Sequence, residues 1–193
     1  MMACNKKENT TTADSTADTT TISAPAYSPM TLNDSATVSG TDTGSTATAL
    51  NDQDKKFADA AARGGMMEVM MGDLAAKTST NASVKALDEM MSKDHGKANE
   101  ELKKWASASG NTLPTSLNVE QQKKHDELKT KKGTEFDKMY TALMVSDHKK
   151  DIADFQKEAS EGSETSLKGF ASKTLPTLEH HLMESEKAKA AVK

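Results

Sequence analysis

The chain has almost no cysteine and few aromatic residues, and both shortages limit what it can be. A single cysteine, Cys4, among 193 residues cannot form a disulfide within the chain. Aromatic residues make up only 4% of the sequence, so a core must be built from leucine, methionine, alanine and valine. A fold held together by internal disulfides is therefore excluded.

The sequence also lacks a long apolar run and an excess of positive charge. The densest apolar stretch, MMEVMM at residues 66–71, is far shorter than the ~20 residues that a membrane-spanning helix needs. The formal net charge is -4, so we expect no general electrostatic attraction to nucleic acid. Neither a transmembrane segment nor a nucleic-acid partner is expected.

Residues 1–50 are rich in threonine, serine, alanine and aspartate and show no sustained apolar period. Such a segment cannot bury enough surface to offset its ordering entropy, so we predict a disordered tether. The context MACN around Cys4 resembles the end of a bacterial lipoprotein signal, although the basic and apolar regions of a full signal are missing. We expect a lipid at Cys4 to hold the chain on a membrane; the alternative is an ordinary cysteine in a tail.

From residue 51 to residue 193 helix-forming residues dominate, and turn signals are sparse. Apolar residues recur at helical spacing in four long segments, and a short polar segment lies between the second and third. Pro176 lacks an N–H and should kink or split the last helix. The expected helices span residues 52–78, 82–109, 119–132, 134–160 and 164–191.

The links between the long helices predict how they are arranged. Short links join the first two and the last two, so each pair should form an antiparallel hairpin. The middle connection has more than 20 residues and its own helix, enough to travel back along the bundle. One long crossover of this kind makes the second and third long helices parallel. We therefore predict an all-α, ferritin-like four-helix bundle.

Two adjacent histidines near the C-terminal end, His180 and His181, are candidates for a site inside the bundle. A helix turns 100° per residue, so His181 falls on the shoulder of the inward face that Leu178 marks. His180 points away from that face, toward solvent. Only His181 is therefore expected to reach the interior.

The second and third long helices carry similar segments, MMSKDH at residues 90–95 and LMVSDH at residues 143–148. Each segment places an aspartate and a histidine beside the apolar stripe, with a methionine one turn before the histidine. On the first helix, Glu68 lies at the shoulder of the stripe. Hairpin pairing and the crossover bring these groups to one height, so each long helix offers a polar side chain at mid-bundle.

Two metal chemistries fit these side chains. Carboxylate oxygens and imidazole nitrogens could bind iron, zinc or manganese. Alternatively, Met91 and Met144 beside their histidines could provide thioether ligands for Cu(I). The candidate oxygen and nitrogen ligands are Glu68, Asp94, His95, Asp147, His148 and His181.

Other interpretations stay open at this point. The chain contains no Glu-x-x-His, so the usual di-iron ligand set is not matched and a ferroxidase-like enzyme is disfavoured. The same aspartates and histidines could instead form a buried hydrogen-bond network, because buried polar groups need partners. The protein would then be a structural or protein-interaction module.

Several of these motifs together resemble a known family. The run GGMMEVMMGDLAAKTSTNASVKALDEMMSKDH, the repeated TLPT, the two DH pairs and EHHL are similar to a bacterial family of predicted outer-membrane proteins, domain of unknown function 4142. The similarity covers about residues 52–190 and implies an exported or lipid-linked four-helix bundle without an established activity. The family's polar positions map onto Glu68, Asp94, His95, His148 and His181.

We therefore expect a protein of the cell envelope, in the periplasm or on the outer membrane, held by a lipid. The expected role is to bind a metal ion at mid-bundle for metal handling or stress, rather than to act as an enzyme. The metal is expected to be a divalent ion (iron, zinc or manganese) or Cu(I).

Overall fold

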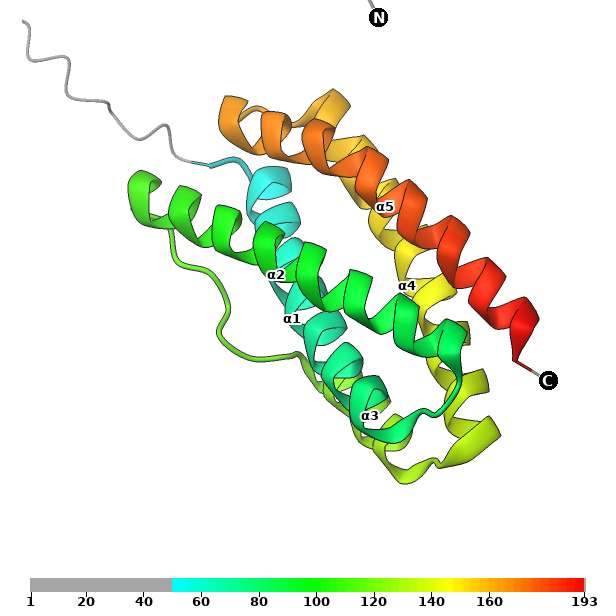
Figure 1. Cartoon of the computed structure of the whole chain (residues 1–193). Coiled ribbons are helices and arrows are strands. Elements are labelled where there is room, and N and C mark those ends of the chain that lie inside the picture. Colours follow the sequence, from blue (N-terminus) through cyan, green and yellow to red (C-terminus); the bar gives the residue numbers. More distant parts are fainter. Residues whose placement is uncertain (1–49, 193) are drawn as a thin grey trace, which may run out of the picture. The chain divides into compact units, whose positions relative to one another are not determined.

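A computed structural model describes residues 50–192 of the chain (Figure 1). Apart from Leu50, the predicted tether of residues 1–50 lies outside the described residues, and so does the predicted lipidation of Cys4. Among residues 50–192, no helix combines the length and the apolar character that crossing a membrane requires.

The described part of the chain is built from helices and their connections, as predicted. The first two helices have the predicted bounds, and the other three differ from them by one or two residues. The elements are α1 (Asp52–Thr78), α2 (Ala82–Ser109), α3 (Val119–Thr130), α4 (Gly133–Glu161) and α5 (Thr165–Ala191).

Local side-chain chemistry explains where these helices begin and end. The Asn51 side chain accepts a hydrogen bond from the N–H of Asp54, and Asn81 caps α2 in the same way. Asn118 and Gln121 form a capping box at the start of α3. Gly110 ends α2 with a φ of 68°, a left-handed conformation that glycine adopts without strain.

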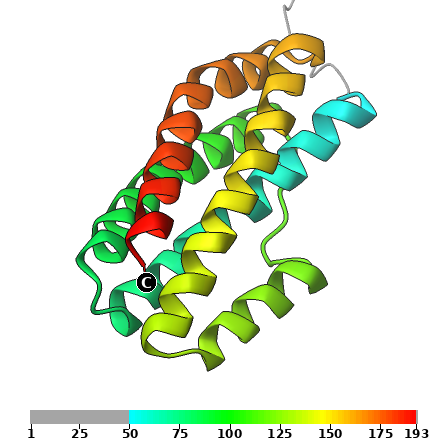
Figure 2. The same ribbon diagram turned by 90° about the vertical axis from the view of Figure 1, so that its right-hand side faces the viewer.

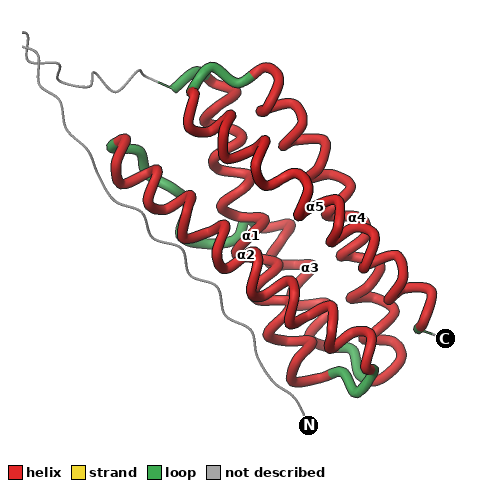
Figure 3. The backbone as a smooth tube through the Cα atoms, turned by 45° about the horizontal axis from the view of Figure 1, so that its top comes forward, coloured by secondary structure: helices red, strands yellow, loops and turns green. Residues whose placement is uncertain are grey.

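The four long helices form two hairpins that pack side by side (Figures 1 and 3). Helix α1 pairs with α2 and α4 pairs with α5, while α1 also contacts α4 and α2 also contacts α5. Helix α3 carries the chain back along the bundle before α4 begins, so α2 and α4 run in the same direction (Figure 2). The predicted bundle with one long crossover is thus confirmed.

Helix α5 departs from the prediction at Pro176. The proline lies inside one continuous helix, so the helix is not split. Figure 2 shows that α5 bends along its length instead. A bend accommodates the proline ring and the missing N–H without ending the helix.

The interior has two apolar clusters, one toward each end of the bundle. One cluster contains Met71, Met91, Phe136 and Met144, and the other contains Phe57, Leu102, Phe155 and Leu178. Along α2 the first cluster ends at Met91 and the second begins at Leu102; along α4 the corresponding residues are Met144 and Phe155. The polar residues at mid-helix therefore lie between two apolar cores.

Candidate metal centre

Three histidines from three different helices meet between these cores. His95 comes from α2, His148 from α4 and His181 from α5, and their exposed fractions are 6%, 0% and 0%. Nε2 of His95, Nε2 of His148 and Nδ1 of His181 lie 3.3 Å from one another in all three pairs. The ring centroids are 5.1–5.4 Å apart, so each ring turns one nitrogen toward a common centre.

The size of this triangle suits a metal ion. The centre of a triangle with 3.3 Å sides lies 3.3/√3, or about 1.9 Å, from each corner. Bonds from zinc to imidazole nitrogen measure about 2.0–2.1 Å, so an ion slightly above the plane would reach all three nitrogens. The cluster could therefore hold a metal ion.

The other nitrogen of each ring faces a hydrogen-bond acceptor. Nδ1 of His148 donates to the Met144 carbonyl at 2.9 Å, and Nε2 of His181 donates to the Asp94 carboxylate at 3.1 Å. Nδ1 of His95 lies 2.9 Å from one Glu68 oxygen, and Nδ1 of His148 lies 3.3 Å from the other. Such outer partners fix the orientation of a metal-binding histidine and its protonated nitrogen.

These outer partners decide where the lone pairs point. A neutral imidazole carries one N–H, and a carbonyl or carboxylate can only accept it. The N–H groups of His148 and His181 therefore point outward, and with Glu68 ionised that of His95 does too. Three lone pairs then converge at 3.3 Å with no donor among them. A cation at the centre, or a proton on one of the three nitrogens, would offset their repulsion.

Burial keeps the histidines neutral. It lowers the pKa of His95 and of His181 to about 4, and it lowers the pKa of His148 as well. Burial also raises the pKa of Glu68 to about 7, against the opposing effect of His148. A cation at the centre would favour the ionised form of Glu68, because it supplies the charge that burial otherwise leaves uncompensated.

Comparison with known proteins places this bundle in a family. Residues 39–188 match the family model described as Domain of unknown function (DUF4142). The chain belongs to the DUF4142 family. None of the curated proteins that were compared matches it.

A solved structure has a similar arrangement of helices. The crystal structure of a DUF305 fragment from Deinococcus radiodurans resembles this DUF4142 chain with a TM-score of 0.65 at 11% sequence identity. The similarity covers 74% of this chain and 98% of that fragment. At this identity it shows the fold alone. Neither comparison bears on where the protein is located.

The predicted site residues of this DUF4142 chain occupy two kinds of position in the structure. His95, His148 and His181 point toward the centre. Glu68 and Asp94 contact their outer nitrogens, so the geometry gives these two carboxylates an orienting position rather than that of ligands. His180 is exposed on the surface of α5, as its helical angle predicts.

The other predicted ligands lie apart from the centre. Met91 and Met144 are fully buried members of the apolar cluster beside it. One oxygen of Asp147 lies 3.3 Å from the ammonium of Lys124 on α3. Asp147 therefore belongs to the contact between α3 and α4.

Sequence reasoning missed one acid next to this site, Asp151. Burial and the charge of Glu68 raise its pKa well above the ordinary range. It lies three residues after His148 and four after Asp147, so all three share one face of α4. That spacing is the signal in the sequence that could have found it.

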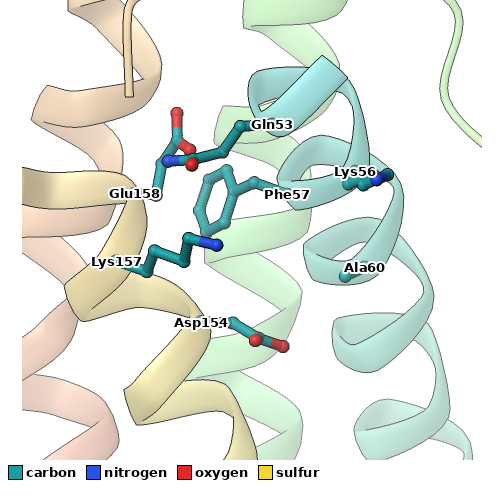
Figure 4. A pocket seen from close by; sticks show the side chains of 7 residues that line it. All are labelled: Gln53, Lys56, Phe57, Ala60, Asp154, Lys157 and Glu158. Carbon is teal, nitrogen blue, oxygen red and sulfur yellow. The ribbon is translucent and has the colours of Figure 1, made fainter. Parts of the chain in front are cut away.

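A separate pocket of about 460 Å³ lies between the first turns of α1 and the last turns of α4 (Figure 4). Phe57 forms part of its wall, and Lys56 and Lys157 also line it. Gln53 and the buried Glu158 lie side by side at one end of the pocket (Figure 4). None of the three histidines lines it.

Proposed function

We propose that this protein binds one transition-metal ion between His95, His148 and His181 and serves in metal handling rather than catalysis. One observation carries the proposal: three buried ring nitrogens from three helices face one another at 3.3 Å. With all three N–H groups turned outward, a hydrogen-bond network leaves this centre without a donor. A bound cation satisfies all three lone pairs at once.

The ligand set favours Zn²⁺ or Cu(I) over manganese. Imidazole suits zinc, copper and iron, whereas manganese prefers oxygen ligands, and no oxygen faces the centre of the triangle. Nitrogens bound to zinc at tetrahedral angles are about 3.3 Å apart, which is the spacing observed. Zn²⁺ is therefore the first ion to test, and Cu(I) is the second.

A structural role for the same residues is the competing hypothesis. Met144 and Asp94 accept hydrogen bonds from two of the histidines, so part of a buried network is present. In that case a proton on His95 would have to point inward, with Glu68 protonated on its outer side. The bundle would then be held together without any ion.

The location in the cell envelope and the role in stress stay predictions. They rest on the sequence resemblance and on the MACN context of Cys4, which lies outside the described residues. A lipid anchor at Cys4 would place a metal-binding bundle at a membrane surface.

Equilibrium dialysis tests the metal function directly. Metal-stripped protein is dialysed against Zn²⁺ or Cu(I), and the ratio of metal to protein is measured. His181→Ala and His180→Ala form a matched pair, because the two histidines are neighbours and only His181 faces the centre. We expect one ion per chain in the wild type and in His180→Ala, and none in His181→Ala.

Two results would contradict the proposal. The first is a wild type that retains neither ion. The second is a His180→Ala variant whose ratio of metal to protein falls as far as that of His181→Ala. Circular dichroism of both variants checks that the bundle still folds.

A further inference from the structure

A cavity of about 140 Å³ opens between α1, α3 and α4, beside the histidine cluster. Its lining includes Glu68, Asp147 and Asp151 together with Lys124 of α3. Gly64 of α1 also borders it, and the nearest atom to a Cβ added there would be an Asp151 oxygen at 3.5 Å. With Glu120 of α3, the cavity brings four carboxylates from three helices to one opening, beside the cations of Arg63, Lys124 and Lys150.

A second, smaller cavity continues inward from the same residues. It has a volume of about 20 Å³ and is lined by Glu68, Asp151 and His95. The two cavities share Glu68 and Asp151, so both border the same two acids. A particle of the size of water needs roughly 10–15 Å³, so the inner cavity has room for one. Glu68 and Asp151 therefore border both the outer cavity and the inner cavity that His95 lines.

The carboxylates along this path have free binding capacity. The Oδ2 atom of Asp147 is buried and has no hydrogen-bond partner, while its Oδ1 faces Lys124 at 3.3 Å. Glu68 is 1% exposed, and neither of its oxygens is held in hydrogen-bond geometry. Unpartnered carboxylate oxygens attract and coordinate cations.

We propose that this opening is the route by which the metal cation reaches the histidines, an inference that rests on the proposed metal function. Asp147 and Asp151 draw in the hydrated cation, and Glu68, which contacts both His95 and His148, passes it to the centre. Lys124 covers the mouth and competes with the cation for Asp147. No covalent step is involved.

A small movement of α3 away from the bundle would expose the opening of this cavity. Only Leu128 among its 12 residues is buried, so few apolar contacts hold α3 against the bundle. Lys124 bridges α3 to the bundle through Asp147 and also lies 3.6 Å from Glu120 of its own helix. The Lys124 side chain is about a third exposed, so solvent screens this ion pair and it opens readily.

The rate of Zn²⁺ uptake distinguishes this route from any other. Stopped-flow mixing of metal-stripped protein with Zn²⁺, followed by a zinc-sensitive dye, gives the association rate constant, and titration against the same dye gives the affinity. Asp151→Asn removes one carboxyl group from the path with little change in shape. We expect association to slow about three- to tenfold, with a smaller change in affinity and a weaker dependence on ionic strength.

Two further variants are expected to change the association rate in a different way: one should raise it, and one should leave it unchanged. Lys124→Gln removes the cation over the mouth and is expected to speed association. Asp59→Asn is the matched control: it makes the same change from carboxylate to amide at an exposed side chain of α1 that lies outside the opening. Its association rate should equal that of the wild type.

The outcomes separate this inference from the function on which it rests. Equal rates in the wild type, Asp151→Asn and Lys124→Gln would overturn the route and point to another path, such as one past Asp94, whose side chain is 35% exposed beside His181. A wild type that binds neither Zn²⁺ nor Cu(I) would overturn the metal function itself, and the route with it.

Discussion

Glu68 is the residue on which the chemistry of the centre depends most after the histidines themselves. It contacts His95 and His148 from outside the triangle, so one buried carboxylate orients two rings. At 1% exposure its charge is costly, and burial raises its pKa to about 7. An ion at the centre offsets that cost, so metal binding and the ionisation of Glu68 should be coupled.

We expect Glu68→Gln to keep one Zn²⁺ per chain but to weaken its affinity about 10- to 100-fold, which is the usual cost of losing an outer partner of a ligand. Glutamine carries no negative charge beside His95 and His148 to stabilise the bound cation. Competition titration against a chelator of known affinity measures the change. Glu186→Gln, which alters an exposed ion pair with Lys149, is the control. Complete loss of the ion in Glu68→Gln would instead identify Glu68 as a ligand.

At the scale of the elements, buried acids join the start of α1 to the turn between α4 and α5. Asp54 accepts hydrogen bonds from the N–H and the hydroxyl of Ser163, with the N–H at 2.9 Å. Glu158 is fully buried beside it, and a Cβ at Gly162 would lie 2.5 Å from a Glu158 oxygen. Glycine is therefore required for α4 to end so close to this carboxyl.

Burial and the neighbouring Asp54 raise the pKa of Glu158 to about 7. Burial alone would raise the pKa of Asp54 too, but hydrogen bonds from Ser163 outweigh it and lower that pKa. Glu158 and Asp54 therefore lose their protons in different pH ranges. Because folding favours the protonated form of Glu158, its contribution to stability is complete below its ordinary pKa of 4.5. That contribution is lost as the pH rises through about 7.

Glu158→Gln should remove this pH dependence, because the amide does not ionise. We expect the variant to gain stability relative to the wild type as the pH rises from about 4.5 to above 7, by up to about 3 kcal/mol. Urea unfolding at several pH values gives the free energy of unfolding of the variant and of the wild type. Groups that titrate alike in both proteins cancel in the difference between the two values. A difference that stays constant with pH would contradict the assignment.

At the scale of the whole bundle, a layer of polar side chains at mid-height brings the four long helices into contact. Glu68, His95, His148 and His181 come one from each long helix, and apolar clusters pack on both sides of them. Without an ion, and with the three N–H groups turned outward, this layer contributes three buried lone pairs with no donor. With an ion it links α2, α4 and α5 directly.

Zn²⁺ should therefore raise the thermal stability of the metal-stripped protein. Free metal at 100 times its dissociation constant stabilises the native state by about 2.7 kcal/mol. For a domain of this size, that corresponds to a rise in Tm of roughly 5–10 °C. We expect no rise in His148→Ala. Differential scanning calorimetry measures both, and an equal rise in the variant would show that the ion binds elsewhere.

The sequence by itself determined the helices, their topology and the height of the histidines. Apolar spacing and caps such as Asn81 act over a few residues, so the bounds of α1 and α2 could be predicted without the partners. Connection lengths then settled which helices run parallel. The helical angle also separated His181 from His180, because neighbours on a helix point about 100° apart.

Only the tertiary structure decided which side chains face the centre and which support them. A helical angle places Glu68 and His95 on facing stripes, but the orientation of each ring depends on atoms contributed by other helices. The Met144 carbonyl, Glu68 and Asp94 turn the rings, and Lys124 draws Asp147 toward α3. Side-chain rotamers are set by packing between elements, which periodicity along one chain does not encode.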